Sequence, residues 1–183
     1  MSENIKREVK REKKKGLSIS DIMLVAVLLA AGAVLKTVVG NIVNIGGMKP
    51  NFIIAMYCLA ILLIKPKVYE AGIVGLLAGA VCQILPGTPY INLISELAGA
   101  LVMGLIIKLP LDLKKFSFKP IVGTFVSTVV SGGLYTVFLF LFTHAEKSAM
   151  AAYVPIVLCT ALLNTVLVQI LYLPLNKIIK KQG

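Results

Sequence analysis

The sequence predicts an all-α polytopic membrane protein with six transmembrane helices and both termini on the cytoplasmic side. Its 183 residues are 58% hydrophobic, with a mean hydropathy of +0.92, whereas soluble domains are about 45–50% apolar. Six apolar segments alternate with turn signals, and basic residues gather at every second connection. An even number of spans returns the chain to the side on which it starts.

The predicted helices have bounds set by hydropathy, proline and glycine. They are Ile19 to Val39, Pro50 to Ile64, Tyr69 to Leu85, Ile91 to Leu109, Pro120 to Phe142, and Ala149 to Leu173. Pro50 and Pro120 suit the first turn of a helix, where the missing N–H removes no hydrogen bond. The second segment is short, about 22 Å at 1.5 Å per residue, so we expect it beside a cavity or an irregular region.

Sixteen of the nineteen basic residues fall into four clusters that the six spans place on one face, which the positive-inside rule assigns to the cytoplasm. The clusters lie in the N-terminal tail, at Lys65 and Lys67, between Lys108 and Lys119, and between Lys177 and Lys181. We therefore divide the chain into a basic cytoplasmic tail (residues 1–17) and a transmembrane domain (residues 18–183). The blocks are short and lack interleaved aromatic residues, which argues against nucleic acid; they serve as a topology signal or contact anionic lipid headgroups.

Reactive motifs are missing from the sequence. It has no nucleotide-binding glycine loop, no Ser/His/Asp set and no His-rich metal motif. Cys58, Cys82 and Cys159 lie inside apolar segments and are interpreted as small buried side chains. We expect neither an enzyme nor a cofactor.

Glu96 is the most informative single residue. It lies one to two turns inside the fourth segment, where a carboxylate is costly unless it is paired or hydrated. Asn92 shares its helix face, and Gly99, Ala100 and Met103 continue that face with residues that leave room for a ligand. Glu96 could bind an ammonium group; alternatively it forms a structural ion pair with Lys36 or Lys49, or is protonated and hydrogen-bonded.

Lys36 and Lys49 lie outside the cytoplasmic clusters, near the opposite membrane boundary. Lys49 precedes Pro50 and Asn51, where the free N–H groups of a helix start favour an anion. The two lysines could hold a carboxylate, although Lys36 could equally extend to lipid headgroups. The connection from Gly40 to Lys49 is apolar and rich in glycine, and we expect it to fold over the bundle as a lid.

Other polar and aromatic residues recur at helical spacing. The fifth segment carries Thr124, Thr128, Ser131 and Tyr135 in one stripe, and the sixth carries Thr160 and Asn164. These residues either bond between helices or meet a donor group in a cavity. Tyr90, Tyr135, Phe138 and Tyr153 could wall an apolar pocket or anchor the protein at the interface.

Small residues four apart allow helices to approach closely in lipid. Ala26 and Ala30 form one such pair in the first segment, and Gly75 and Gly79 form another in the third. The glycine pair is interpreted as internal packing. The alanine pair serves either packing within the bundle or docking to a partner membrane protein.

These features together resemble the substrate-binding S components of energy-coupling-factor (ECF) transporters. The segment Gly46-Gly47-Met48-Lys49-Pro50-Asn51-Phe52, followed by an apolar helix and a Lys-Pro turn, is similar to the tryptophan-specific TrpP family. The resemblance implies an ECF S-component-like bundle in the bacterial cell membrane, with a transmembrane coupling subunit and two cytoplasmic ATPases as partners. It assigns Ala26 and Ala30 to the coupling-subunit interface.

The same resemblance places the substrate under the first external loop. The residues it implies for tryptophan are Gly47, Lys49, Asn51, Asn92, Glu96, Tyr135 and Asn164. Glu96 would hold the ammonium group, Lys49 the carboxylate, and Asn164 or a Thr hydroxyl the indole N–H. The alternatives are an S component for a vitamin or another amino acid, and a stand-alone secondary transporter.

Overall fold

The computed structural model describes residues 16–43, 49–85, 88, 90–112, 117–143 and 147–182. These residues fold into helices α1 (Ile19–Ile42), α2 (Phe52–Ile64), α3 (Val68–Ile84), α4 (Ile91–Ile106), α5 (Lys119–Thr143) and α6 (Lys147–Gln182). Among them there is no strand, only an isolated antiparallel bridge between Asp112 and Ser117. The predicted all-α fold and its six helices are confirmed.

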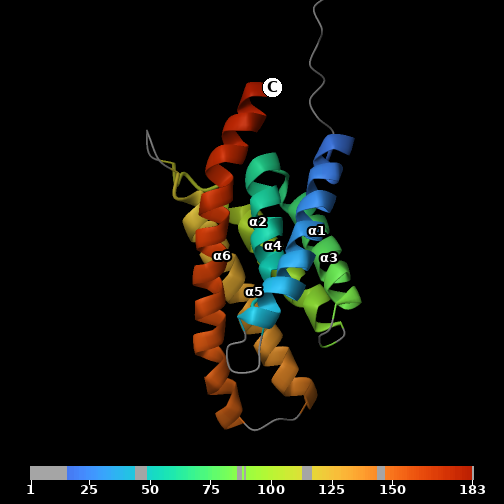
Figure 1. Ribbon diagram of the computed structural model, residues 1–183, viewed down its shortest axis with the longest axis vertical. Coiled ribbons are helices and arrows are strands. Elements are labelled where there is room, and N and C mark those ends of the chain that lie inside the picture. The colour runs from blue at the N-terminus through green and yellow to red at the C-terminus, as the bar shows by residue number, and fades with distance from the viewer. Residues whose placement is uncertain are drawn as a thin grey trace, which may run out of the picture.

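The helices run alternately up and down the bundle, so the start of α1 and the end of α6 lie at the same end (Figure 1). Lys65, Lys67 and Lys119 lie at that end, at the end of α2, the start of α3 and the start of α5. The basic tail up to residue 15 lies outside the described residues. Within the described part, the charge clusters therefore share one end, as the sequence indicates.

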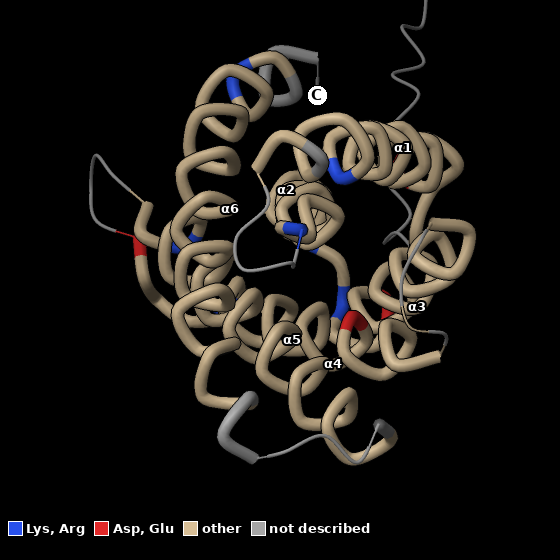
Figure 2. The backbone as a smooth tube through the Cα atoms, turned by 60° about the horizontal axis from the view of Figure 1, so that its bottom comes forward, with Lys and Arg blue, Asp and Glu red and all other residues tan. Residues whose placement is uncertain are grey.

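Helix α2 is the centre of the bundle. All its residues from Phe52 to Leu62 are buried, and it contacts each of the other five helices, which surround it (Figure 2). A helix that is apolar on every side is covered by protein or by lipid, and here the other five helices cover α2. Its 13 residues span about 20 Å.

Three helices contain stretches apolar and long enough to cross a bilayer. They are 22 residues in α1, 24 in α5 and 29 in α6, whereas α2, α3 and α4 are shorter apolar helices. The chain is therefore a membrane protein that combines three long helices with three shorter ones.

Most helix boundaries differ from the prediction by one to three residues, and the end of α6 differs by nine. Helix α2 begins at Phe52 rather than Pro50, because the Asn51 side chain accepts the N–H of Ile53 and caps the helix. Helix α6 continues beyond Leu173 through Pro174 to Gln182. An interior proline removes one intrahelical hydrogen bond, and here the remaining bonds carry the helix past it.

The glycines of α3 pack against α4, as the sequence predicts. A Cβ on Gly75 would lie 2.6 Å from Ala100 Cβ, and one on Gly79 would lie 2.8 Å from Leu93 Cα. The two backbones thus touch where the glycines lie. Ala26 and Ala30 of α1, in contrast, are exposed, so they do not pack within the described bundle.

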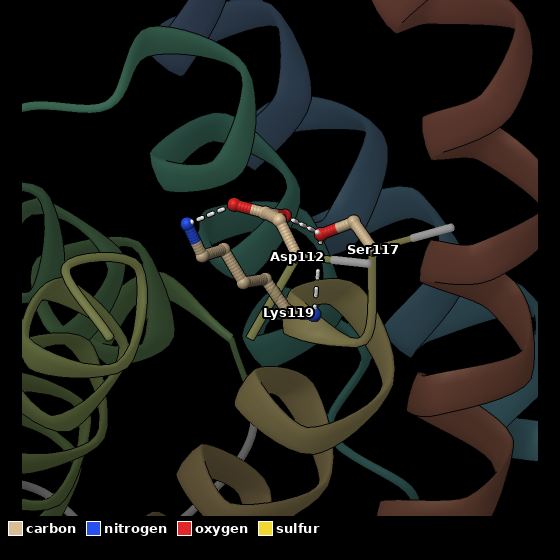
Figure 3. Close-up of polar contacts among 3 residues, drawn as sticks. All are labelled: Asp112, Ser117 and Lys119. Atoms are coloured by element: carbon tan, nitrogen blue, oxygen red, sulfur yellow. Dashed lines mark hydrogen bonds and ion pairs between the residues drawn. The ribbon is translucent and has the colours of Figure 1, made fainter. Parts of the chain in front are cut away.

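A polar cluster closes the connection between α4 and α5 (Figure 3). Asp112 accepts hydrogen bonds from Ser117 Oγ and from Lys119 Nζ. The bond from Lys119, and to a smaller extent the bond from Ser117, lowers the pKa of the Asp112 carboxyl below its ordinary range. The cluster thereby fixes the bridge that leads into α5.

The lowered pKa predicts how this connection responds to acid. The bonds of Asp112 stabilise the connection fully above the ordinary Asp pKa of about 3.9 and are lost as the pH falls through the lower folded pKa. A carbon-13 NMR titration of Asp112 should give a midpoint below that of an ordinary Asp. Lys119→Gln should move the midpoint up, and identical midpoints in the two proteins would contradict the role of Lys119.

Candidate functional site

A cavity of about 300 Å³ opens near the end of the bundle opposite the termini. Such a volume is at the lower end of the range for small-molecule sites, about 300–1,000 Å³. The cavity is lined by Lys36, Lys49, Asn51, Ile54, Leu85, Asn92, Glu96, Thr128, Ser131, Gly132, Tyr135, Ile156, Val157 and Thr160. The start of the short α2 is part of this lining, which confirms the expectation that this helix lies beside a cavity.

The Glu96 carboxylate is the centre of the site. It is 1% exposed, and its two oxygens accept from different helices: Oε1 from Asn51 Nδ2, and Oε2 from Ser131 Oγ at 2.9 Å. Asn92 lies on the same face of α4 and lines the same cavity, as the spacing predicts. The carboxylate is thus oriented by an amide and a hydroxyl.

Two cationic side chains line the same cavity. Lys36 of α1 is partly buried and its Nζ lies 3.6 Å from Cys82 Sγ. Lys49 is exposed just before α2, and a Cβ on Gly40 would lie 3.3 Å from its Cβ, so the end of α1 packs beside it. One acidic and two basic side chains therefore line one cavity.

The predicted polar stripe of α5 faces this volume. Thr128, Ser131 and Tyr135 line the cavity, while Thr124 is buried one turn deeper. The Tyr135 hydroxyl lies 3.1 Å from that of Thr88, which links α5 to the connection between α3 and α4.

Asn164 is not among the residues that line the cavity, and its contact with substrate stays a prediction. Its Nδ2 donates to the Asn51 carbonyl at 3.1 Å and to Thr128 Oγ1 at 3.4 Å. It lies one layer behind the wall and supports two residues that do line the cavity. A buried amide in a membrane helix bonds to the nearest backbone or hydroxyl, which explains this position.

Gly99, Ala100 and Met103 do not leave room for a ligand either. A Cβ on Gly99 would lie 2.3 Å from Tyr57 Oη, because the glycine allows α4 to approach α2 and α5. Among the four aromatic residues proposed as walls, Tyr135 lines the cavity, whereas Tyr90 is exposed. Phe138 stacks on Phe142, and Tyr153 lies edge-on to Phe140. Gly47 and the centre of the expected lid, residues 44–48, lie outside the described residues.

The apolar walls are aliphatic, and no feature of the sequence predicted them. They are Ile54, Leu85, Ile156 and Val157, from α2, the end of α3 and α6. In an apolar segment, the residue types that face a cavity are the same as those that face lipid. No signal in a single sequence distinguishes the two.

Gly75 determines how closely the part of α4 that carries Glu96 approaches α3. A Cβ on Gly75 would lie 2.6 Å from the Glu96 carbonyl oxygen and 3.0 Å from Leu97 Cα. The α4 turn that carries the carboxylate therefore rests directly on the α3 backbone.

These features define an integral membrane protein of α-helices that encloses a charged cavity near one end of its bundle. The chain belongs to the tryptophan transporter TrpP family, whose sequence model matches residues 18–180. It is 25% identical over 164 residues to a probable tryptophan transport protein of Clostridium acetobutylicum, covering 88% of this chain and 94% of the relative.

A probable tryptophan transport protein of Bacillus subtilis is 23% identical over 170 residues, covering 91% of this chain and 96% of the relative. No solved structure gives a significant match. The family match covers all six helices, so the predicted membership in the TrpP family is confirmed.

Gly75→Val should destabilise the protein by about 1–3 kcal/mol, because the new side chain must push the Glu96 turn away from α3. The melting temperature of the purified protein measures this effect. Ala80→Val is the matched control, since Ala80 lies on the same helix but is exposed. Equal melting temperatures for both variants would contradict the close contact between α3 and α4.

Proposed function

We propose that this chain is the tryptophan-binding S component of an ECF-type importer. In this proposal all six helices cross the bacterial cell membrane, both termini are cytoplasmic, residues 1–17 form a basic tail and residues 18–183 bind the substrate. The observation that carries the proposal is the charged cavity, in which Glu96 and the lysines Lys36 and Lys49 surround one volume with aliphatic walls. A zwitterion with an apolar side chain matches this combination.

The Glu96 carboxylate would hold the α-ammonium group of tryptophan. An ionised carboxylate has about four lone-pair sites, and the bonds from Asn51 and Ser131 use two of them. The remaining sites can accept from an ammonium group without breaking those bonds. The carboxylate of tryptophan would lie toward Lys49 and Asn51, beside the N-terminus of α2, which favours negative charge.

The indole ring would occupy the aliphatic part of the cavity, beside Ile156 and Val157, with Tyr135 at its edge. Its N–H requires an acceptor, since leaving it unpaired in a dry pocket costs about 1–3 kcal/mol. Thr160 is suited to this role because its hydroxyl donates to the Ile156 carbonyl at 2.8 Å and its oxygen can still accept. Thr160 joins Asn164 in the proposed binding set as a candidate acceptor for the indole N–H.

The coupling subunit would dock on the alanine face of α1. Ala26 and Ala30 are exposed on a helix that also exposes large apolar side chains such as Val27 and Val34. Small exposed residues four apart let a partner helix approach the backbone closely. Two cytoplasmic ATPases would supply the energy, because the sequence carries no nucleotide-binding motif of its own.

Glu96→Gln should weaken tryptophan binding by roughly 10-fold or more, since a hydrogen bond to a charged group contributes about 1.5–3 kcal/mol. Lys36→Gln should have a much smaller effect, because Lys49 and the start of α2 also attract the substrate carboxylate. Isothermal titration calorimetry compares the two. Unchanged affinity in Glu96→Gln would remove Glu96 from the binding site.

Replacing both Ala26 and Ala30 by Leu should abolish copurification with the coupling subunit while tryptophan binding is retained. The larger side chains prevent close helix approach on the outer surface and do not reach the cavity. The matched control is Leu at both Ala151 and Ala152, which are also exposed alanines. Equal recovery of the complex from both double variants would exclude α1 as the docking face.

A further inference from the structure

A second hollow lies on the outside of the bundle, between α5 and α6. Its volume is about 250 Å³, and its side walls are apolar: Val129 and Val137 from α5, with Met150, Val154 and Leu158 from α6. Thr136 carries the one hydroxyl in the lining, and that hydroxyl donates to the Gly132 carbonyl at 2.8 Å. The hollow therefore suits an apolar ligand.

The hollow faces the hydrocarbon of the membrane. Both helices that form it contain stretches that can cross a bilayer, and Val137, Val154 and Leu158 are exposed on the protein surface. Gly133 opens the hollow, since a Cβ added there would have no atom within 4 Å. A helix with its side chains is about 10–12 Å across and cannot enter this volume, whereas a single acyl chain can.

Val157 forms the wall between this hollow and the charged cavity, because it lines both. It rests on α5 at Gly132, where an added Cβ would lie 2.9 Å from Val157 Cγ1. Pro155, two residues earlier, removes one intrahelical hydrogen bond from this part of α6. The wall is therefore one side chain thick and lies beside a helix segment with weakened backbone support.

We propose that the hollow between α5 and α6 binds one acyl chain of a membrane lipid, and that Val157 transmits its occupancy to the charged cavity. An acyl chain in the hollow packs against Val157 and holds it on Gly132, which keeps the cavity wall closed. Without the chain, Val157 loses its packing on the lipid side. The effect on the cavity rests on the proposed binding of tryptophan there, whereas acyl-chain binding does not.

Photolabelling tests the acyl-chain site. The protein is placed in nanodiscs of phosphatidylglycerol with a diazirine on one acyl chain, and labelled residues are mapped by mass spectrometry. Labels should concentrate on residues 150–158 relative to the lipid-exposed residues Val27 and Val34 of α1. Gly133→Leu should fill the hollow and reduce these labels several-fold, and Gly133→Ala should reduce them less, whereas Ala80→Leu should leave them unchanged.

Calorimetry tests the coupling. The parent and Ala80→Leu should lose tryptophan affinity at least 3-fold when lipid is exchanged for a steroid-based detergent, which has no alkyl chain to fill the hollow, whereas Gly133→Leu should lose less because its own side chain supports Val157. Equal losses in all three proteins would overturn the coupling. Two results would overturn the acyl-chain site. One is labelling as strong at Val27 and Val34 of α1 as at residues 150–158. The other is a dimer joined through α5 and α6 in native mass spectrometry. If no variant binds tryptophan, the proposed function fails and the labelling alone decides the acyl-chain site.

Discussion

The hydrogen bonds to the Glu96 carboxylate join three helices at one point inside an apolar bundle. Asn51 precedes α2, Ser131 belongs to α5, and Glu96 itself to α4, so this set of bonds fixes how these helices meet. A buried carboxylate is costly unless such donors satisfy it. Asn51 therefore ties the start of α2 to Glu96, and Ser131 ties the polar stripe of α5 to it.

The short central helix makes this arrangement possible. Because α2 has only 13 residues, its N-terminus ends inside the bundle rather than at the surface, and Asn51 can cap it and reach Glu96 from the same position. Asn164 holds the Asn51 carbonyl from the other side. The space left beyond the start of α2 is the cavity. A full-length second helix would fill it.

The sequence was sufficient for the helices, their alternation and the polar part of the site. Glu96, Asn92 and Lys49 are recognisable because a polar or charged residue in an apolar segment requires a partner. The aliphatic wall at Val157 could not be predicted from the sequence, because the identity of an apolar residue does not indicate whether it faces lipid, a cavity or another helix. The positions of Asn164 and Gly99 relative to the cavity could not be predicted either, because a buried amide and a glycine serve helix packing as readily as ligand binding.

The central claim is that the cavity recognises both charges of a zwitterion with an aromatic side chain, and a thermal-shift series on the purified protein tests it most directly. Tryptophan should raise the melting temperature clearly, whereas tryptamine, which lacks the carboxylate, and indole-3-propionate, which lacks the ammonium group, should each raise it much less. Water-soluble vitamins should have no effect. Equal stabilisation by tryptophan and either analogue, or stabilisation by a vitamin and not by tryptophan, would contradict the account.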